Sequence, residues 1–296
     1  MPDSESRLPD LPTDWPNKDC SNFITVAGLR WHVQRAGSGP TIVLVHGTAG
    51  ATHTWRALFP LLTPWADVIA FDLPGHGFTT GATAEQLSLG GMALAVRALL
   101  AELSVRRPVI AVGHSAGAAV LLQLAATREF APQSFIGVNS ALVSVNALGQ
   151  MFLPFARALV DVDALRTGVA AMLRNGVLPR MLLRSTGTPL DAPQEARYVA
   201  MLTDETRVGA VVRMMSRWDL PALQEQFPSL QFPVTLVHSS DEPWVPFDDL
   251  LHATRTLPMR TVIDLAPAGH LIPDEKPRAL ADIIVSAFAA LASHPG

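Results

Sequence analysis

The stretch VIAVGHSAGAAV, residues 109–120, decides the fold of this chain. Its first four residues are apolar and mostly β-branched, which predicts a short buried strand, and the small apolar residues after Ser115 predict a helix packed on that strand. Between the two, Gly113-x-Ser115-x-Gly117 has the spacing of a tight strand-to-helix turn that lifts the serine hydroxyl above the sheet edge. Because the first N–H groups of the helix point at the same place, the stretch predicts a nucleophilic serine beside an anion-stabilising site.

Strand and helix patterns alternate on both sides of this turn. Residues 23–26 and 29–33 flank Ala27-Gly28 and predict a β-hairpin. The other expected strands are residues 41–45, 68–71, 135–138, 234–237 and 261–265, and the expected helices are 54–62, 87–103, 191–201 and 278–291. Such alternation predicts an α/β fold with a mostly parallel sheet of about eight strands and flanking helices.

The alternation of strand and helix patterns, and the segments where it is absent, divide the chain into an arm, a core and an insert. Residues 1–20 are rich in proline and acidic residues and predict a flexible N-terminal arm. Residues 21–142 and 219–296 together form the expected α/β core. Residues 143–218 contain only helical patterns, so we expect an inserted helical cap over the serine.

Composition excludes several classes of protein. Of the 296 residues, 49% are hydrophobic and 16% charged, which is enough apolar material for a large core, and the net charge of −4 argues against a nucleic-acid partner. The single cysteine, Cys20, cannot form an internal disulfide, and the nine histidines show no metal-ligand spacing, so we expect no metal, no cofactor and a cytoplasmic location. The polar N-terminus does not have the pattern of a secretory signal, and there is no long uncharged apolar run typical of a membrane span.

Several motifs together resemble the α/β-hydrolase family. They are His46-Gly47 after one strand, residues 72–77 (DLPGHG) after the next, and the serine turn. A narrower resemblance, to the hydrolase-like magnesium chelatase accessory proteins of bacteriochlorophyll synthesis, rests on residues 28–35, 46–55, 72–79 and 112–119. The resemblance implies an α/β-hydrolase fold and a role beside magnesium insertion into protoporphyrin, without specifying a reaction.

The family resemblance also implies a Ser-His-Asp triad. A serine hydroxyl needs an adjacent base, and His270 follows the last expected strand at the place where the family carries it. The orienting acid should follow strand 234–237: counting from the strand end favours Asp241, whereas the usual spacing before a Val-Pro pair favours Glu242. We take Asp241 as the first choice. The backbone N–H groups of Thr48 and Ala116 are the expected oxyanion hole.

The candidate substrate contacts are less specific. His53 and Trp55 begin the helix expected near the mouth of the site, and His114 precedes the nucleophile; packing is the simpler interpretation for each. The full set of candidate contacts is His114, His53, Trp55, Met151, Phe155, Met215 and Trp244.

The cap has an unusual composition. Residues 143–218 hold nine arginines, no lysine and six acids, together with many methionines. Methionine suits adaptable apolar surfaces and arginine pairs with carboxylates, so the cap fits a porphyrin with propionate groups. The alternative is that the methionines pack cap helices and the arginines form a solvated face. Peripheral membrane contact through this apolar cap is a further hypothesis.

Three hypotheses for function follow. The first is a serine hydrolase that cleaves an ester in or beside the magnesium-insertion step, with a tetrapyrrole as its small-molecule substrate. The second is a non-catalytic porphyrin carrier or chaperone that works with magnesium chelatase subunits. The third is a generic carboxylesterase.

Overall fold

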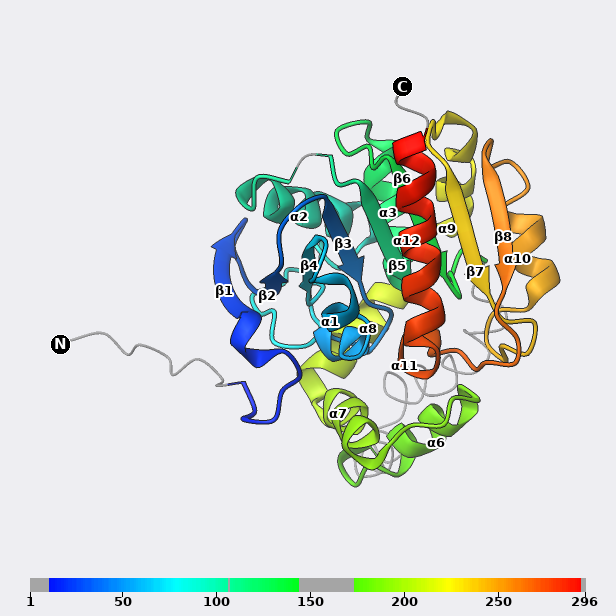
Figure 1. Ribbon diagram of the computed structural model, residues 1–296. Coiled ribbons are helices and arrows are strands. Elements are labelled where there is room, and N and C mark those ends of the chain that lie inside the picture. The colour runs from blue at the N-terminus through cyan, green and yellow to red at the C-terminus, as the bar shows by residue number, and fades with distance from the viewer. Residues whose placement is uncertain (1–10, 106, 144–172, 294–296) are drawn as a thin grey trace.

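The computed structural model of the protein describes residues 11–105, 107–143 and 173–293. Its centre is an eight-stranded sheet with the order β1-β2-β4-β3-β5-β6-β7-β8 (Figure 1). The strands are β1 (Ser21–Val26), β2 (Leu29–Ala36), β3 (Thr41–Val45), β4 (Asp67–Phe71), β5 (Ile110–His114), β6 (Ser134–Val138), β7 (Val234–His238) and β8 (Arg260–Asp264). The pairs β1–β2 and β2–β4 are antiparallel and the other pairs are parallel, which confirms the expected mostly parallel sheet.

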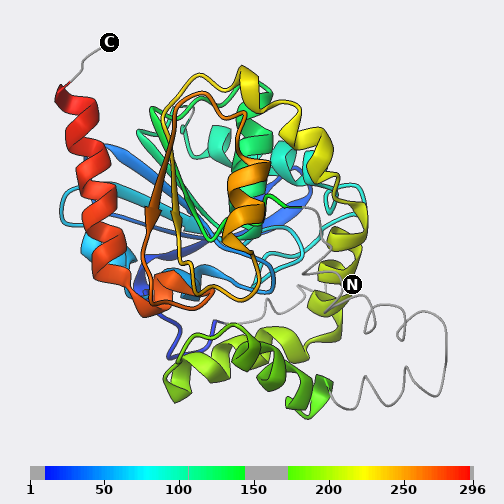
Figure 2. The same ribbon diagram turned by 90° about the vertical axis from the view of Figure 1, so that its right-hand side faces the viewer.

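Helices cover both faces of the sheet, so its central strands are buried on both sides. In β3, Val43 and Val45 belong to one hydrophobic core with α2 (Leu89–Glu102) and α3 (Ala116–Ala126). The alternate residues Ile42 and Leu44 belong to a second core with α1 (Phe59–Leu62) and α12 (Pro277–Ser293). Figure 2 shows the two helical layers on opposite sides of the sheet. This double burial explains why the β3 sequence is apolar throughout rather than alternating.

A group of helices separates β6 from β7 in the sequence and lies beyond one end of the sheet (Figures 1 and 2). Its described members are α6 (Val177–Ser185), α7 (Ala192–Thr203) and α8 (Glu205–Arg217). Helix α7 begins where the sequence predicts, because the Asp191 side chain accepts a hydrogen bond from the Gln194 backbone N–H. The remaining helices among the described residues are α9 (Leu220–Gln224), α10 (Phe247–Ala253) and α11 (Ile272–Glu275), with 3-10 turns at Lys18–Cys20, Thr52–Trp55 and Phe227–Ser229. Within the described residues, no helix combines the length and apolar character that crossing a bilayer requires.

Two expected segments differ in the structure. The helix expected over 54–62 is split into the 3-10 turn Thr52–Trp55 and α1, since Pro60 lacks an N–H and disfavours a continuous helix. Residues 11–20, expected in a flexible arm, pack on the core instead. Trp15 is only 4% exposed, and its Nε1 donates a hydrogen bond of 3.1 Å to Thr52 Oγ1. A buried tryptophan supplies enough apolar contact to order this part of the chain. Residues 1–10 lie outside the described residues.

Candidate active site

Ser115 occupies a strained turn between β5 and α3. Its backbone has φ 49° and ψ −118°, a conformation that residues with a side chain rarely adopt. The flanking glycines are required by contact: a Cβ on Gly113 would lie 2.5 Å from the Ala118 backbone, and one on Gly117 would lie 2.2 Å from the Val45 carbonyl oxygen. The turn therefore has the geometry that residues 109–120 predict, with Ser115 at the carboxyl end of a central strand.

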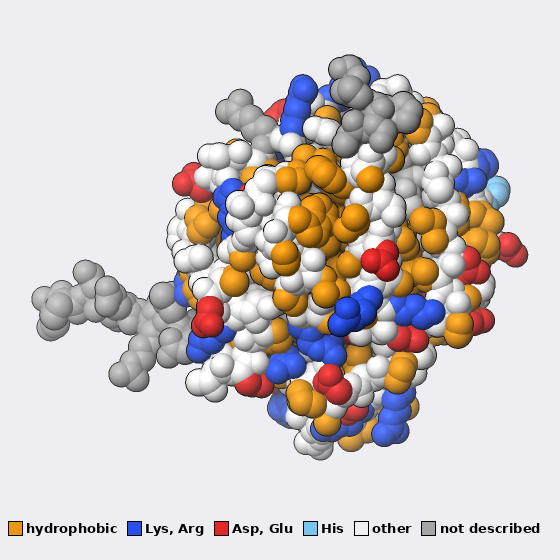
Figure 3. All heavy atoms as spheres, viewed as in Figure 1, with side chains coloured by type: hydrophobic (Ala, Val, Ile, Leu, Met, Phe, Trp, Pro, Cys, Tyr) orange, Lys and Arg blue, Asp and Glu red, His pale blue; other side chains and the backbone are white. Residues whose placement is uncertain are grey.

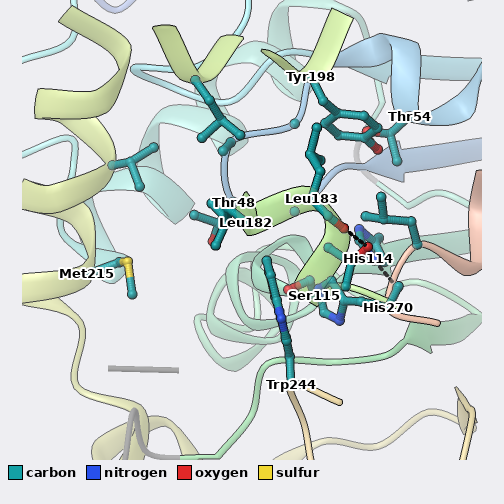
Figure 4. A pocket seen from close by; sticks show the side chains of 17 residues that line it. Thr48, Thr54, His114, Ser115, Leu182, Leu183, Tyr198, Met215, Trp244 and His270 are labelled. Atoms are coloured by element: carbon teal, nitrogen blue, oxygen red, sulfur yellow. Dashed lines mark hydrogen bonds between the residues drawn. The ribbon is translucent and has the colours of Figure 1, made fainter. Parts of the chain in front are cut away.

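His270 lies on the loop after β8 and lines the same pocket as Ser115 (Figure 4). Its Nδ1 is 3.1 Å from Glu242 Oε1, an ion-pair distance without the alignment of a full hydrogen bond. The Glu242 carboxylate is held in place by the backbone N–H groups of Trp244 and Val245, the latter at 2.7 Å. A buried, fixed carboxylate thus faces one side of the His270 ring.

The carboxylate beside His270 is Glu242 and not the expected Asp241. The Glu242 N–H donates to the Ser239 carbonyl at 3.0 Å, which closes a turn after β7. This turn places Asp241 at its exposed apex and returns Glu242 toward the sheet, where its side chain is fully buried. Counting residues from the strand end favours Asp241 because it takes no account of this turn, whereas the spacing before Val245-Pro246 indicates Glu242, the residue that lies beside His270.

The loop after β3 supplies backbone donors next to Ser115. His46 Nε2 accepts a hydrogen bond of 3.0 Å from the Leu73 N–H, so the proton must be on Nδ1, which donates to the Gly47 carbonyl at 2.8 Å. Burial lowers the pKa of His46, which keeps the ring neutral in this role. Within the described part of the chain, the N–H groups of Thr48 and Ala116 donate to no acceptor. Both are therefore available to a bound oxyanion.

Two buried side chains hold the His270 backbone from the core. The His270 carbonyl accepts hydrogen bonds from His114 Nε2 at 3.0 Å and from Asn139 Nδ2 at 2.9 Å. Asn139 Oδ1 also accepts from the Ser239 N–H at 3.2 Å, so this amide joins the acid turn to the base loop. Burial lowers the pKa of His114 to about 3, so His114 acts as a neutral donor. Asn139 was not among the predicted site residues; the signal for it in the sequence is an amide side chain directly after a parallel strand.

The pocket in front of Ser115 is mainly apolar, with a cavity volume of about 70 Å³. Its walls include Leu182, Leu183 and Leu202 from the helices between β6 and β7. At one side, the Tyr198 hydroxyl donates to Asp274 Oδ2 at 2.9 Å (Figure 4 labels Tyr198). Burial raises the pKa of Tyr198 to about 12, so it stays protonated. At roughly 10–15 Å³ per water molecule, this cavity has room for a small acyl or alcohol group.

The candidate contact residues fall into three groups. His114, Met215 and Trp244 line the pocket, and the Trp244 ring lies 4.7 Å from the His270 ring. His53 and Trp55 are fully buried and do not line it, because the 3-10 turn that carries them points into the core. Met151 and Phe155 lie outside the described residues.

Several of the cap arginines that the structure describes pair with acidic side chains of the protein itself. Arg174 pairs with Glu205 at 2.7 Å, Arg180 with Glu195 at 3.2 Å, and Arg197 with Asp14 at 3.2 Å. Figure 3 shows basic and acidic side chains interspersed over the region where Figure 1 places α6 and α7. Among the described residues, the pocket lining includes no arginine. Nor do the described residues include a cluster of three or more His, Cys, Asp or Glu side chains arranged to hold a metal ion.

Comparison with known proteins agrees with the observed fold. Residues 42–283 match the alpha/beta hydrolase family model, and the chain belongs to this family. The chain is 32% identical to the magnesium-chelatase 30 kDa subunit of Rhodobacter capsulatus, over 93% of this chain and 96% of that protein. It is also 26% identical to the hydrolase YugF of Bacillus subtilis, over 86% and 91% of the two chains. The crystal structure of Cfl2 from Burkholderia cenocepacia shares the fold, with a TM-score of 0.77 and 24% identity over 90% of this chain and 95% of that one.

Proposed function

We propose that this protein is a serine hydrolase that cleaves an ester, with Ser115 as nucleophile, His270 as general base and Glu242 as the orienting acid. The observation that carries the proposal is the strained Ser115 turn in the same pocket as His270, whose far ring nitrogen faces a buried carboxylate. Strain of this kind persists where the surrounding structure holds it, and it concentrates at functional sites.

The proposed reaction has two halves, acylation of Ser115 and hydrolysis of the acyl-serine, and His270 acts as the base in both. His270 Nε2 takes the proton of Ser115 as Oγ attacks the ester carbonyl, and the N–H groups of Thr48 and Ala116 stabilise the oxyanion. Collapse of the intermediate expels the alcohol, which leaves with the proton from His270. Water then attacks the acyl-serine with His270 again as base, which releases the acid and regenerates Ser115.

Labelling with a fluorophosphonate tests the nucleophile. We expect covalent modification of Ser115, located by mass spectrometry of peptides, and no labelling of Ser115→Ala. Ser140 is a suitable control, because it is a buried serine near the strand ends whose replacement by alanine should leave labelling intact. An unlabelled wild-type protein would refute the proposed function.

We further propose that the substrate belongs to the magnesium-insertion step of bacteriochlorophyll synthesis, with a tetrapyrrole ester as the candidate. The similarity to a magnesium-chelatase subunit over nearly the whole of both chains supports this placement. The same similarity favours a second candidate function, a porphyrin carrier that works with magnesium chelatase subunits without catalysis.

Absorbance titration with protoporphyrin and its magnesium and methyl-ester forms separates these functions. Conversion of the ester by wild type and not by Ser115→Ala supports the hydrolase, whereas tight binding by both without conversion supports the carrier. If neither protein binds a tetrapyrrole, a generic carboxylesterase remains, and a panel of simple esters would identify it.

A further inference from the structure

A short segment at the C-terminal end of helix α6 hydrogen-bonds to the backbone of the loop that carries His270. The 185–188 segment comprises Ser185, Thr186, Gly187 and Thr188. The His270 N–H donates to the Thr186 carbonyl at 2.7 Å, and the next N–H, that of Leu271, donates to Thr188 Oγ1 at 2.9 Å. Since His114 and Asn139 bind the His270 carbonyl from the core, the backbone of His270 is held from two opposite sides.

The same segment also contacts the loop that carries the acid. Trp244 Nε1 donates to Ser185 Oγ at 3.2 Å, and the Trp244 ring packs on the His270 ring. Ser185 Oγ in turn donates to the Leu182 carbonyl at 2.7 Å, which fixes it to α6. The 185–188 segment therefore contacts both loops that bring Glu242 and His270 together.

Close backbone packing makes this contact rigid. A Cβ on Gly269 would lie 2.5 Å from the Gly187 carbonyl carbon and 2.5 Å from the Thr188 nitrogen, so only glycine allows the two backbones to approach this closely. A Cβ on Gly187, whose φ is +70°, would lie 3.6 Å from Pro243 Cγ of the acid loop and 3.7 Å from Gly269 Cα. Thr186 is 1% exposed and Thr188 is 8% exposed, so both residues that accept these hydrogen bonds are shielded from water.

We propose that the 185–188 segment is a positioning element that sets the geometry of His270 relative to Glu242 and Ser115. The catalytic site is then assembled only when the end of α6 is packed against the loop that carries His270. This inference rests on the proposed function. Its chemical basis is that displacing a general base by about 1 Å can lower the reaction rate by on the order of a hundredfold. Because Leu182 and Leu183 of α6 line the pocket, a ligand that shifts α6 also shifts the base, which couples pocket occupancy to catalytic competence.

The isosteric change Thr188→Val tests the proposal, because it removes the acceptor for the Leu271 N–H and keeps the shape of the side chain. We expect roughly tenfold or greater slowing of fluorophosphonate labelling of Ser115, a lower kcat for p-nitrophenyl acetate with little change in KM, and a shifted pH dependence of labelling. Thr188→Ser keeps the hydroxyl and should restore the wild-type rate. Thr203→Val is the matched control, since among the described residues the Thr203 hydroxyl bonds only to the Ala200 carbonyl within α7.

Amide hydrogen exchange gives a readout that does not depend on activity. The Leu271 N–H should exchange faster in Thr188→Val than in wild type, while amides of the β5 core stay protected. Equal labelling rates for wild type and Thr188→Val, or equal Leu271 exchange, would overturn the positioning role and leave the proposed function intact. Failure of the wild-type protein to label at all would instead overturn the proposed function.

Discussion

Glu242 Oε1 lies 3.1 Å from His270 Nδ1, although an aspartate stands next to it in the sequence. The two neighbouring carboxylates have opposite environments: Glu242 is buried and bound by two backbone N–H groups, whereas Asp241 is exposed. A carboxylate in the first environment can fix the tautomer of the imidazole and stabilise its charged form, and one in the second cannot.

The neighbouring carboxylates provide a matched pair of variants. Glu242→Gln should lower kcat by about 10²- to 10⁴-fold, because the amide cannot stabilise the charged imidazole. Asp241→Asn should leave kcat within about twofold, as expected for an exposed group that does not touch the reacting atoms. Steady-state ester hydrolysis measures both. The opposite result, with Asp241→Asn inactive and Glu242→Gln active, would show that the acid turn rearranges in solution.

The sequence predicts most of the sheet because burial on both faces leaves a strong local signal. The continuous apolar run of β3 and the glycine spacing around Ser115 are local patterns. The first predicts a buried strand and the second a tight strand-to-helix turn. The acid was harder to predict, since the choice between Asp241 and Glu242 depends on one turn. The contact between Thr188 and Leu271 could not be predicted, because residues 83 positions apart meet only through tertiary packing.

The strained backbone of Ser115 predicts an unusual order of stability. Alanine has a Cβ and keeps the strain at φ 49°, whereas glycine relieves it, so Ser115→Gly should be more stable than Ser115→Ala by about 1 kcal/mol, with both inactive. Urea unfolding measures the free energy of unfolding of each variant. The same two substitutions at Ser216, an exposed position in helix α8, provide the control. There alanine should be the more stable by about 1 kcal/mol, since glycine is a poor helix former. If alanine were also favoured at position 115, the turn would not be strained.

Three buried histidines predict a loss of stability on mild acidification. Burial lowers the pKa values of His53, His76 and His114 from 6.5 to about 3. At pH values between about 3 and 6.5, the three histidines bind protons in the unfolded chain but not in the folded chain. The free energy of unfolding therefore falls as the pH drops below about 6.5, by at most about 1.4 kcal/mol per pH unit for each histidine.

Urea unfolding at pH 7.5, 6.5 and 5.5 measures this slope. His53→Gln should reduce the slope whatever its effect on stability at neutral pH, because the slope counts only titrating groups. A stability that is constant from pH 7.5 to 5.5 would mean that these histidines take up protons in the folded state, and that the neutral form of His114 beside the nucleophile is not maintained.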